Sequence, residues 1–213
     1  MSAPARWFAP CAKGFEYLLV DELKALGASE AREALAGAHF SGDPALGYRA
    51  CLWSRLASRV LLPLAEFPAN EAAELYEGVH AIDWTQHLVA GRTLAVDAVG
   101  RSTGLINSVY TAQKAKDAIV DRLRSDTGAR PDVDPHNADL RVHVALRQGR
   151  AIVSIDLAGA PLHERGWRRG SGDAPMRETL ACAMLLRAHW PAIHAAGGPL
   201  VDKRAIQVAD PIK

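Results

Sequence analysis

The sequence predicts an α+β protein built from two small domains, and three observations lead to this prediction. The 213 residues are 49% apolar and 23% charged, which is enough apolar material for a real core. Strand-like and helix-like segments alternate over the first part of the chain. Further along, the longest helical pattern, 106–124, precedes two segments in which apolar and polar residues alternate.

The first domain is predicted from five segments. Residues 6–11 are short and apolar and indicate a strand, and residues 14–27 repeat apolar side chains at helical spacing. A strand over 34–41, a helix over 45–58 and a strand over 60–66 follow. This order of strand, helix, strand, helix and strand is typical of small split-βαβ domains.

A second unit begins after Pro68. Asn70 is predicted to cap a helix through Gly78, and 93–99 alternates as a strand. The helix over 106–124 is predicted to turn Val109, Ala112, Ile119 and Leu123 inward.

The rest of the second unit is a loop and a hairpin. Two prolines in the loop 130–135 are expected to exclude regular pairing there. Strands over 140–146 and 151–157 flank the turn Gln148-Gly149 and predict a hairpin with one buried face. After the hairpin we expect a Gly- and Arg-rich loop over 161–173 and a helix over 174–190. Residues 200–202 could begin a further strand.

The net charge of +1 hides an asymmetry along the chain. Residues 1–100 carry 8 basic and 12 acidic side chains, and residues 101–213 carry 17 and 12. A basic half is a candidate surface for a polyanion.

Several kinds of site are missing from the sequence. The three cysteines, Cys11, Cys51 and Cys182, lack zinc or disulfide spacing and are expected to be free thiols in a reducing compartment. No phosphate-binding loop, nucleophile elbow or metal-ligand pattern occurs. No apolar run is long enough to cross a bilayer and no signal peptide is visible, so we expect a cytoplasmic protein without metal or membrane contact.

Basic side chains on the long helix are the first candidate for nucleic-acid binding. Polar residues near the start of this helix could bind phosphate together with the free backbone N–H groups of the helix N-terminus. The alternative is a salt-bridged face exposed to solvent, because Asp117 and Asp121 lie on the same helix. The predicted RNA contacts here are Arg101, Asn107, Lys114, Lys116 and Arg122.

The second candidate is the segment HERGWRRG at 163–170, where three arginines surround one tryptophan. Arginine forks bind phosphate through two hydrogen bonds, and a tryptophan can stack on an unpaired base. A tryptophan in a loop can equally be a packing anchor. The predicted RNA contacts are Arg165, Trp167, Arg168 and Arg169.

Several long segments resemble one known family in order and spacing. They are LWSRLASR at 52–59, YEGVHAIDW at 76–84, NSVYTAQKAKDAIVD at 107–121, and the stretches 163–169 and 174–180. Together they are similar to the N-terminal part of the bacterial 23S rRNA guanine-N2 methyltransferases, the RlmL family, over about residues 6–202.

The resemblance implies a division of the chain into three parts. These are a ferredoxin-like N-terminal domain over 1–67, a THUMP RNA-binding domain over 68–160, and a linker over 161–213 with a C-terminal helix and the truncated start of a methyltransferase domain. It further implies that the chain positions structured ribosomal RNA for methylation that depends on S-adenosylmethionine.

One departure from the family decides the expected activity. Where the family continues into a glycine-rich loop that cradles S-adenosylmethionine, Asp202 is followed here by Lys203-Arg204-Ala205-Ile206-Gln207. We therefore expect no enzyme activity and no cofactor in this chain, with ribosomal RNA and a missing methyltransferase domain as partners. The helix 174–190 is then expected to be partly exposed, mobile, or packed on a neighbouring or second chain.

Two alternatives stay open at the level of sequence. One is a residual RNA methyltransferase that binds S-adenosylmethionine at a degenerate site. The other is a protein-interaction scaffold, which would associate through its most exposed apolar patch rather than a basic one.

Overall fold

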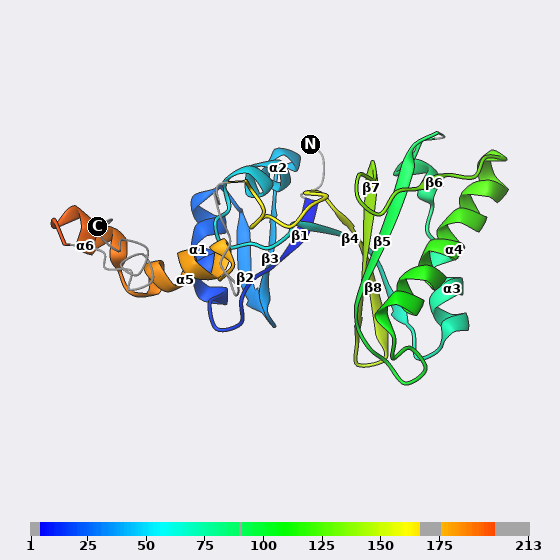
Figure 1. Ribbon diagram of the computed structural model, residues 1–213, viewed down its shortest axis with the longest axis horizontal. Coiled ribbons are helices and arrows are strands. Elements are labelled where there is room, and N and C mark those ends of the chain that lie inside the picture. Colours follow the sequence, from blue (N-terminus) through cyan, green and yellow to red (C-terminus); the bar gives the residue numbers. More distant parts are fainter. Residues whose placement is uncertain (1–4, 90, 167–175, 199–213) are drawn as a thin grey trace, which may run out of the picture.

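The structure of the chain is a computed structural model that describes residues 5–89, 91–166 and 176–198. Within these residues eight strands form one sheet in the order β2-β3-β1-β4-β8-β7-β5-β6. Helices cover parts of this sheet, so the predicted α+β class is confirmed (Figure 1).

The N-terminal unit is a βαββαβ arrangement. Its elements are β1 (Ala5–Pro10), α1 (Glu16–Ala25), β2 (Glu30–Ala34), β3 (Gly37–Gly42), α2 (Pro44–Trp53) and β4 (Leu61–Pro68). Its core contains Leu19 and Leu23 of α1, Leu46 of α2, and the stacked rings of Trp7 and Phe40, whose centroids are 5.3 Å apart. Asp43 caps α2 by accepting a hydrogen bond from the backbone N–H of Leu46.

One predicted strand of this unit is in fact a hairpin. The segment 34–41 was expected to be a single strand, but β2 and β3 pair antiparallel around Leu35 and Ala36. Ala36 has a left-handed φ of 54°, a conformation in which glycine or asparagine is usual. The turn therefore contains no glycine or asparagine from which the sequence could have predicted it.

The second unit contains seven elements. They are α3 (Ala72–His80), η1 (Trp84–Gln86), β5 (Thr93–Gly100), α4 (Ser108–Thr127), β6 (Asp132–Val133), β7 (Leu140–Arg147) and β8 (Arg150–Asp156). Both α3 and α4 lie on one side of the strands, where Ile119, Val142 and Val153 share a core with the buried Trp84. The hairpin of β7 and β8 was predicted with Gln148 and Gly149 at its turn, but its second face, expected to be open, is also buried at His143, Ser154 and Asp156.

Two local predictions for this unit were wrong. The N-cap of α3 is Glu71, and Asn70 instead donates its backbone N–H to the Glu74 carboxylate at 2.6 Å. The two prolines of the loop 130–135 leave room for a short pairing, because Asp132 and Val133 lie between them and pair parallel with the start of β5.

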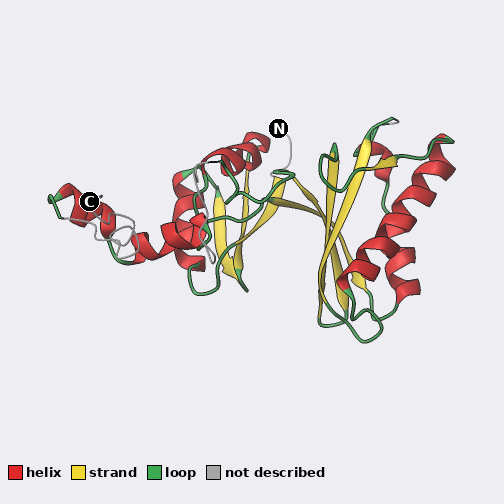
Figure 2. Ribbon diagram, viewed as in Figure 1, coloured by secondary structure: helices red, strands yellow, loops and turns green. Residues whose placement is uncertain are grey.

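The two units are joined by β4, the last strand of the first. It pairs with β8 from Leu61 to Pro68, with an irregularity between Pro63 and Ala65. The paired residues Phe8, Leu61 and Asp156 share the face of the sheet that the helices do not cover. In Figures 1 and 2 the helices of both units lie on the outer sides, so the uncovered sides of the two half-sheets turn toward each other.

The C-terminal segment returns to the N-terminal unit. The helix α5 (Glu178–Arg187) is followed by α6 (Trp190–Ala195). Ala183 is buried against the N-terminal core, and the Arg187 guanidinium lies 5.7 Å from the centre of the Phe15 ring of that unit. Met184 of α5 and Met176, which precedes the helix, are exposed, as expected, but the helix predicted over 174–190 covers only Glu178–Arg187. No helix among the described residues is long and apolar enough to span a membrane.

Candidate nucleic-acid interface

The N-terminal end of α4 lies where three loops of the second unit meet. The N–H of Gly104 donates to the Asn70 carbonyl at 2.6 Å, and the Ser102 hydroxyl donates to the Ala69 carbonyl at 2.7 Å. The Ala69 N–H in turn donates to the Gly149 carbonyl at 2.8 Å. These bonds fix the loop that carries the exposed Arg101 and leads into the helix.

Asn107 is the N-cap of α4. Its side-chain oxygen accepts hydrogen bonds from the backbone N–H groups of Val109 at 2.9 Å and Tyr110 at 3.2 Å. Two donors that the sequence offered to phosphate are therefore used by the helix itself. The structure gives Asn107 a capping role, and any contact with RNA would add to it.

Exposed apolar side chains surround this cap. Ile106 is 78% exposed, Val109 is 74% exposed, and Tyr110 is also exposed. The predicted inward position of Val109 was wrong, because the buried stripe of α4 begins only at Thr111 and Ala115. Sequence reasoning missed this patch, since an apolar residue in a helical period is normally assigned to the core. An exposed tyrosine can stack on an unpaired base.

Lys114 lies one turn further along, beside α3. Its Nζ is 5.0 Å from the centre of the Tyr76 ring, and the Tyr76 hydroxyl donates to Asp121 at 2.7 Å. That hydrogen bond is the main reason why the pKa of Tyr76 is raised. A hollow of about 270 Å³ here is lined by Lys114, Arg124 and Arg130 together with Asp117 and Asp121. The lysine therefore has carboxylates close by.

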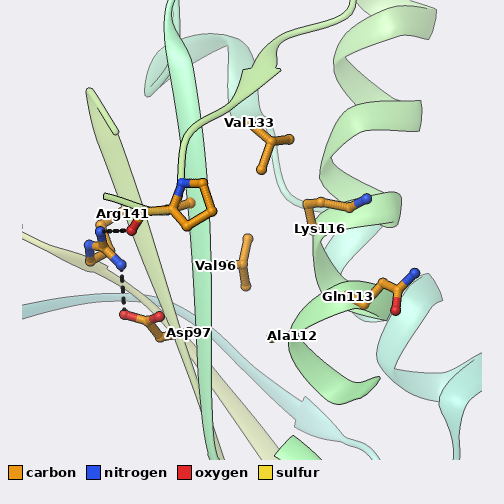
Figure 3. Close-up of a pocket in the computed structure, with 9 residues that line it drawn as sticks. Val96, Asp97, Ala112, Gln113, Lys116, Val133 and Arg141 are labelled. Carbon is orange, nitrogen blue, oxygen red and sulfur yellow. Dashed lines mark hydrogen bonds and ion pairs between the residues drawn. The ribbon is translucent and has the colours of Figure 1, made fainter. Parts of the chain in front are cut away.

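Lys116 lies on a different side of α4, because two residues turn a helix by about 200°. It forms an ion pair with Asp117 at 2.7 Å and lines a pocket of about 210 Å³ between α4 and β5 (Figure 3). On the sheet side of this pocket Arg141 is bound to Asp97 at 3.0 Å and donates to the Pro135 carbonyl at 2.6 Å.

Two of the predicted arginines hold the fold together. Arg122 is paired with Asp126 at 2.6 Å and donates to the His80 carbonyl at the end of α3. Arg165 donates to the carbonyls of Cys51, Leu52 and Ser54 at the C-terminal end of α2, and to Leu162. Carbonyls at a helix C-terminus attract positive charge, so Arg165 fastens the linker to the N-terminal unit.

The structure thus brings together only part of the predicted set. Arg101 and Asn107 share one end of the second unit, while Lys114 and Lys116 separate to two sides of α4. Trp167, Arg168 and Arg169 lie outside the described residues. In the described part of the chain no group of three histidine, cysteine or acidic side chains is placed to hold a metal ion.

Family models identify both units. The RlmL ferredoxin-like domain matches residues 6–61, and the THUMP domain matches residues 69–156. The chain is therefore a ferredoxin-like domain followed by a THUMP RNA-binding domain. These two domains place it in the RlmL family of rRNA large subunit methyltransferases, as the N-terminal part.

Known relatives agree with this placement. The chain is 52% identical over 192 residues to the ribosomal RNA large subunit methyltransferase K/L of Stutzerimonas stutzeri and 53% identical over 192 residues to that of Ectopseudomonas mendocina. Each match covers 90% of this chain, which spans about a quarter of the relatives' length, 26%.

A solved structure has a similar fold. SMU.472, solved in complex with SAH, has a TM-score of 0.73 and 29% identity, over 88% of this chain and 49% of its own.

Proposed function

We propose that this chain recruits structured ribosomal RNA through its THUMP domain and positions it for methylation by a catalytic part that this sequence does not contain. Support comes from the two domain matches and from the names of the relatives. S-adenosylmethionine belongs, in this proposal, to the catalytic part, and we assign no residue of this chain to it.

The observation that carries the proposal is the exposed end of α4. Arg101, Ile106, Val109 and Tyr110 are all exposed there, around the Asn107 cap. Arginine supplies attraction to phosphate, while the tyrosine ring offers a stacking surface for a splayed base. Lys114 and Lys116, each beside a carboxylate, are proposed to add to the binding from the sides of the helix. The loop residues Trp167, Arg168 and Arg169 remain predicted contacts.

The test is RNA affinity measured against salt concentration. The full chain would be titrated with a structured fragment of 23S rRNA, using wild type, Arg101→Gln, Tyr110→Ala and a control, Lys24→Gln, on the far helix α1. Loss of one phosphate contact at Arg101 should reduce the salt slope by about one. Loss of one stacked base at Tyr110 should weaken binding about fivefold or more.

The outcomes separate the alternatives. If both variants bind like Lys24→Gln, the end of α4 is not the interface. Wild type that fails to bind structured RNA would refute the proposal as a whole. Calorimetry with S-adenosylmethionine tests the residual-enzyme alternative, for which we expect no heat of binding. Arg165→Ala is a poor probe of RNA contact, because that side chain caps α2.

A further inference from the structure

The uncovered face of β1, β2 and β3 carries aromatic and basic side chains in two rows. Residues two apart on a strand share a face, and the registers align Phe8 with His39 and His39 with Arg32. The adjoining row contains Arg6, Ser41 and Glu30. Trp7, Ala9, Ala38 and Phe40 occupy the opposite face, in the core with α1 and α2. The open rows are therefore not needed to build this core.

The two rings of this face are in contact with each other. The centroids of Phe8 and His39 are 5.0 Å apart at 47° between their planes. His39 is exposed and Phe8 is half-buried. Gly37 leaves space for the phenyl ring, because a Cβ atom there would come within 2.6 Å of it. The ring of Phe8 therefore lies over the strand surface with His39 beside it.

No ion pair among the described residues neutralises the arginines of this face. Arg6 and Arg32 are exposed, and neither forms an ion pair with another described residue. They line a hollow of about 580 Å³ with His39, Ser41 and Pro63, and Glu30 is its one acidic side chain among the described residues. Partial desolvation, and secondly the charge of Arg32, lowers the pKa of His39. This shift favours the neutral imidazole, which offers a ring rather than a charge.

We propose that this face binds a single-stranded segment of the RNA, with bases stacked on Phe8 and His39 and phosphates held by Arg6 and Arg32. The inference rests on the proposed function and adds a second contact surface, in the other domain. A sheet with aromatic side chains on its open face is how RRM domains hold unpaired bases. A duplex could not use such rings, because its base faces are already stacked.

The charge and the composition of the face favour RNA over a protein partner. Arg6 and Arg32 form no ion pair with a described residue and face only one acidic side chain, Glu30, so the face carries a positive charge that favours a polyanion. Adjacent strands lie about 4.8 Å apart and two residues along a strand span about 6.8 Å, so Arg6 on β1 and Arg32 on β2 are about 12 Å apart on this face. The two arginines therefore stand at opposite corners of this face, where each can hold a different phosphate of one extended strand.

The test uses the full chain and a single-stranded RNA of 12 nucleotides that contains 2-aminopurine, whose fluorescence falls when it stacks. His39→Ala should weaken binding about fivefold or more and reduce the quenching. The double variant Arg6→Gln/Arg32→Gln should reduce the salt slope by about 1.4, the value for two phosphates of a single strand. Phe8→Leu keeps an apolar side chain in place and should reduce the quenching. Lys24→Gln removes a charge from the covered side of the same domain and should leave the affinity, the salt slope and the quenching unchanged.

Each outcome bears on the proposal. If His39→Ala and the arginine double variant match Lys24→Gln in affinity, slope and quenching, this surface is not an RNA platform. Binding of structured RNA through Tyr110 would survive that result, so the proposed function would stand alone. If wild type binds neither RNA, both proposals fall. Circular dichroism of every variant separates a lost contact from a lost fold.

Discussion

The two halves of the sheet differ in whether the charged side chains on their uncovered face form ion pairs. In the THUMP half, Asp156 is fully buried and paired with Arg59, and Asp97 is paired with Arg59 at 3.8 Å and with Arg141 at 3.0 Å. In the ferredoxin-like half, Arg6 and Arg32 are exposed and no ion pair joins them to the described residues. Strand alternation places charged residues on this face in both halves. Whether a carboxylate meets them decides between a structural and a binding role.

The paired cluster also links the two domains. Arg59 precedes β4 of the N-terminal domain, whereas Asp156 and Asp97 belong to β8 and β5 of the THUMP domain. His143 and Ser154, on the same face, are buried beneath this cluster. The uncovered side of the THUMP half is thus closed by ion pairs at the junction, while the other half stays open.

The largest expected effect is on stability when the paired half is broken. Arg59→Met leaves Asp156 buried without its partner, which should cost about 3–5 kcal/mol in the free energy of unfolding. Urea denaturation followed by tryptophan fluorescence measures it. Arg92→Met removes one side of an exposed pair with Asp139 and serves as the control, with a much smaller loss. Equal losses in the two variants would contradict the structural role of the cluster.

The second effect concerns Arg165, which the sequence assigned to RNA. Arg165→Gln removes charged hydrogen bonds to the end of α2 and should cost about 2 kcal/mol without any RNA present. The linker should also be cleaved faster by a protease near 162–166. Arg147→Gln, an exposed site on β7, should change neither measurement. Unchanged stability and cleavage in Arg165→Gln would contradict this structural role and leave RNA contact as the interpretation of Arg165.

The third effect is a dependence of stability on pH. Burial, and then the charge of Arg59, lowers the pKa of His143, while Asp156 and Asp97 oppose the shift. The unfolded chain therefore takes up a proton at a higher pH than the folded chain, and stability falls as the pH drops below about 6.5. The slope from this group is at most about 1.4 kcal/mol per pH unit. His143→Leu should flatten the curve between pH 7 and 5.5, and a curve as steep as that of wild type would argue against this origin.

The pattern of apolar residues along the sequence predicted a helix or strand well where the element depends on local periodicity alone. The helix α4 was predicted over 106–124 from its apolar periodicity, and it runs from Ser108 to Thr127, with Gly128 in the left-handed region at its end. The hairpin around Ala36 escaped because its turn has no characteristic residue. The pairing of β4 with β8 joins residues far apart in the sequence, from Leu61 with Asp156 to Pro68 with Arg150, and no local pattern encodes such a contact.

The site was harder to predict than the fold. A sequence shows which side chains are charged, but it does not show which backbone carbonyl or carboxylate each one meets. Arg122 and Arg165 looked like RNA contacts until their partners at the ends of α3 and α2 were visible. Conversely, Arg6 and Arg32 drew no attention, because they are isolated in sequence and adjacent only through the sheet.

The smallest expected effect is on the open half. Arg32→Gln should change the free energy of unfolding by less than about 0.5 kcal/mol, because the side chain is exposed and no described residue forms an ion pair with it. The same urea experiment measures this, with Arg59→Met as the opposite extreme. A loss near that of Arg59→Met would mean that Arg32 supports the fold, and the difference between the halves would disappear. If Arg32→Gln leaves the free energy of unfolding unchanged but weakens binding of single-stranded RNA, the charge of Arg32 serves ligand binding rather than stability.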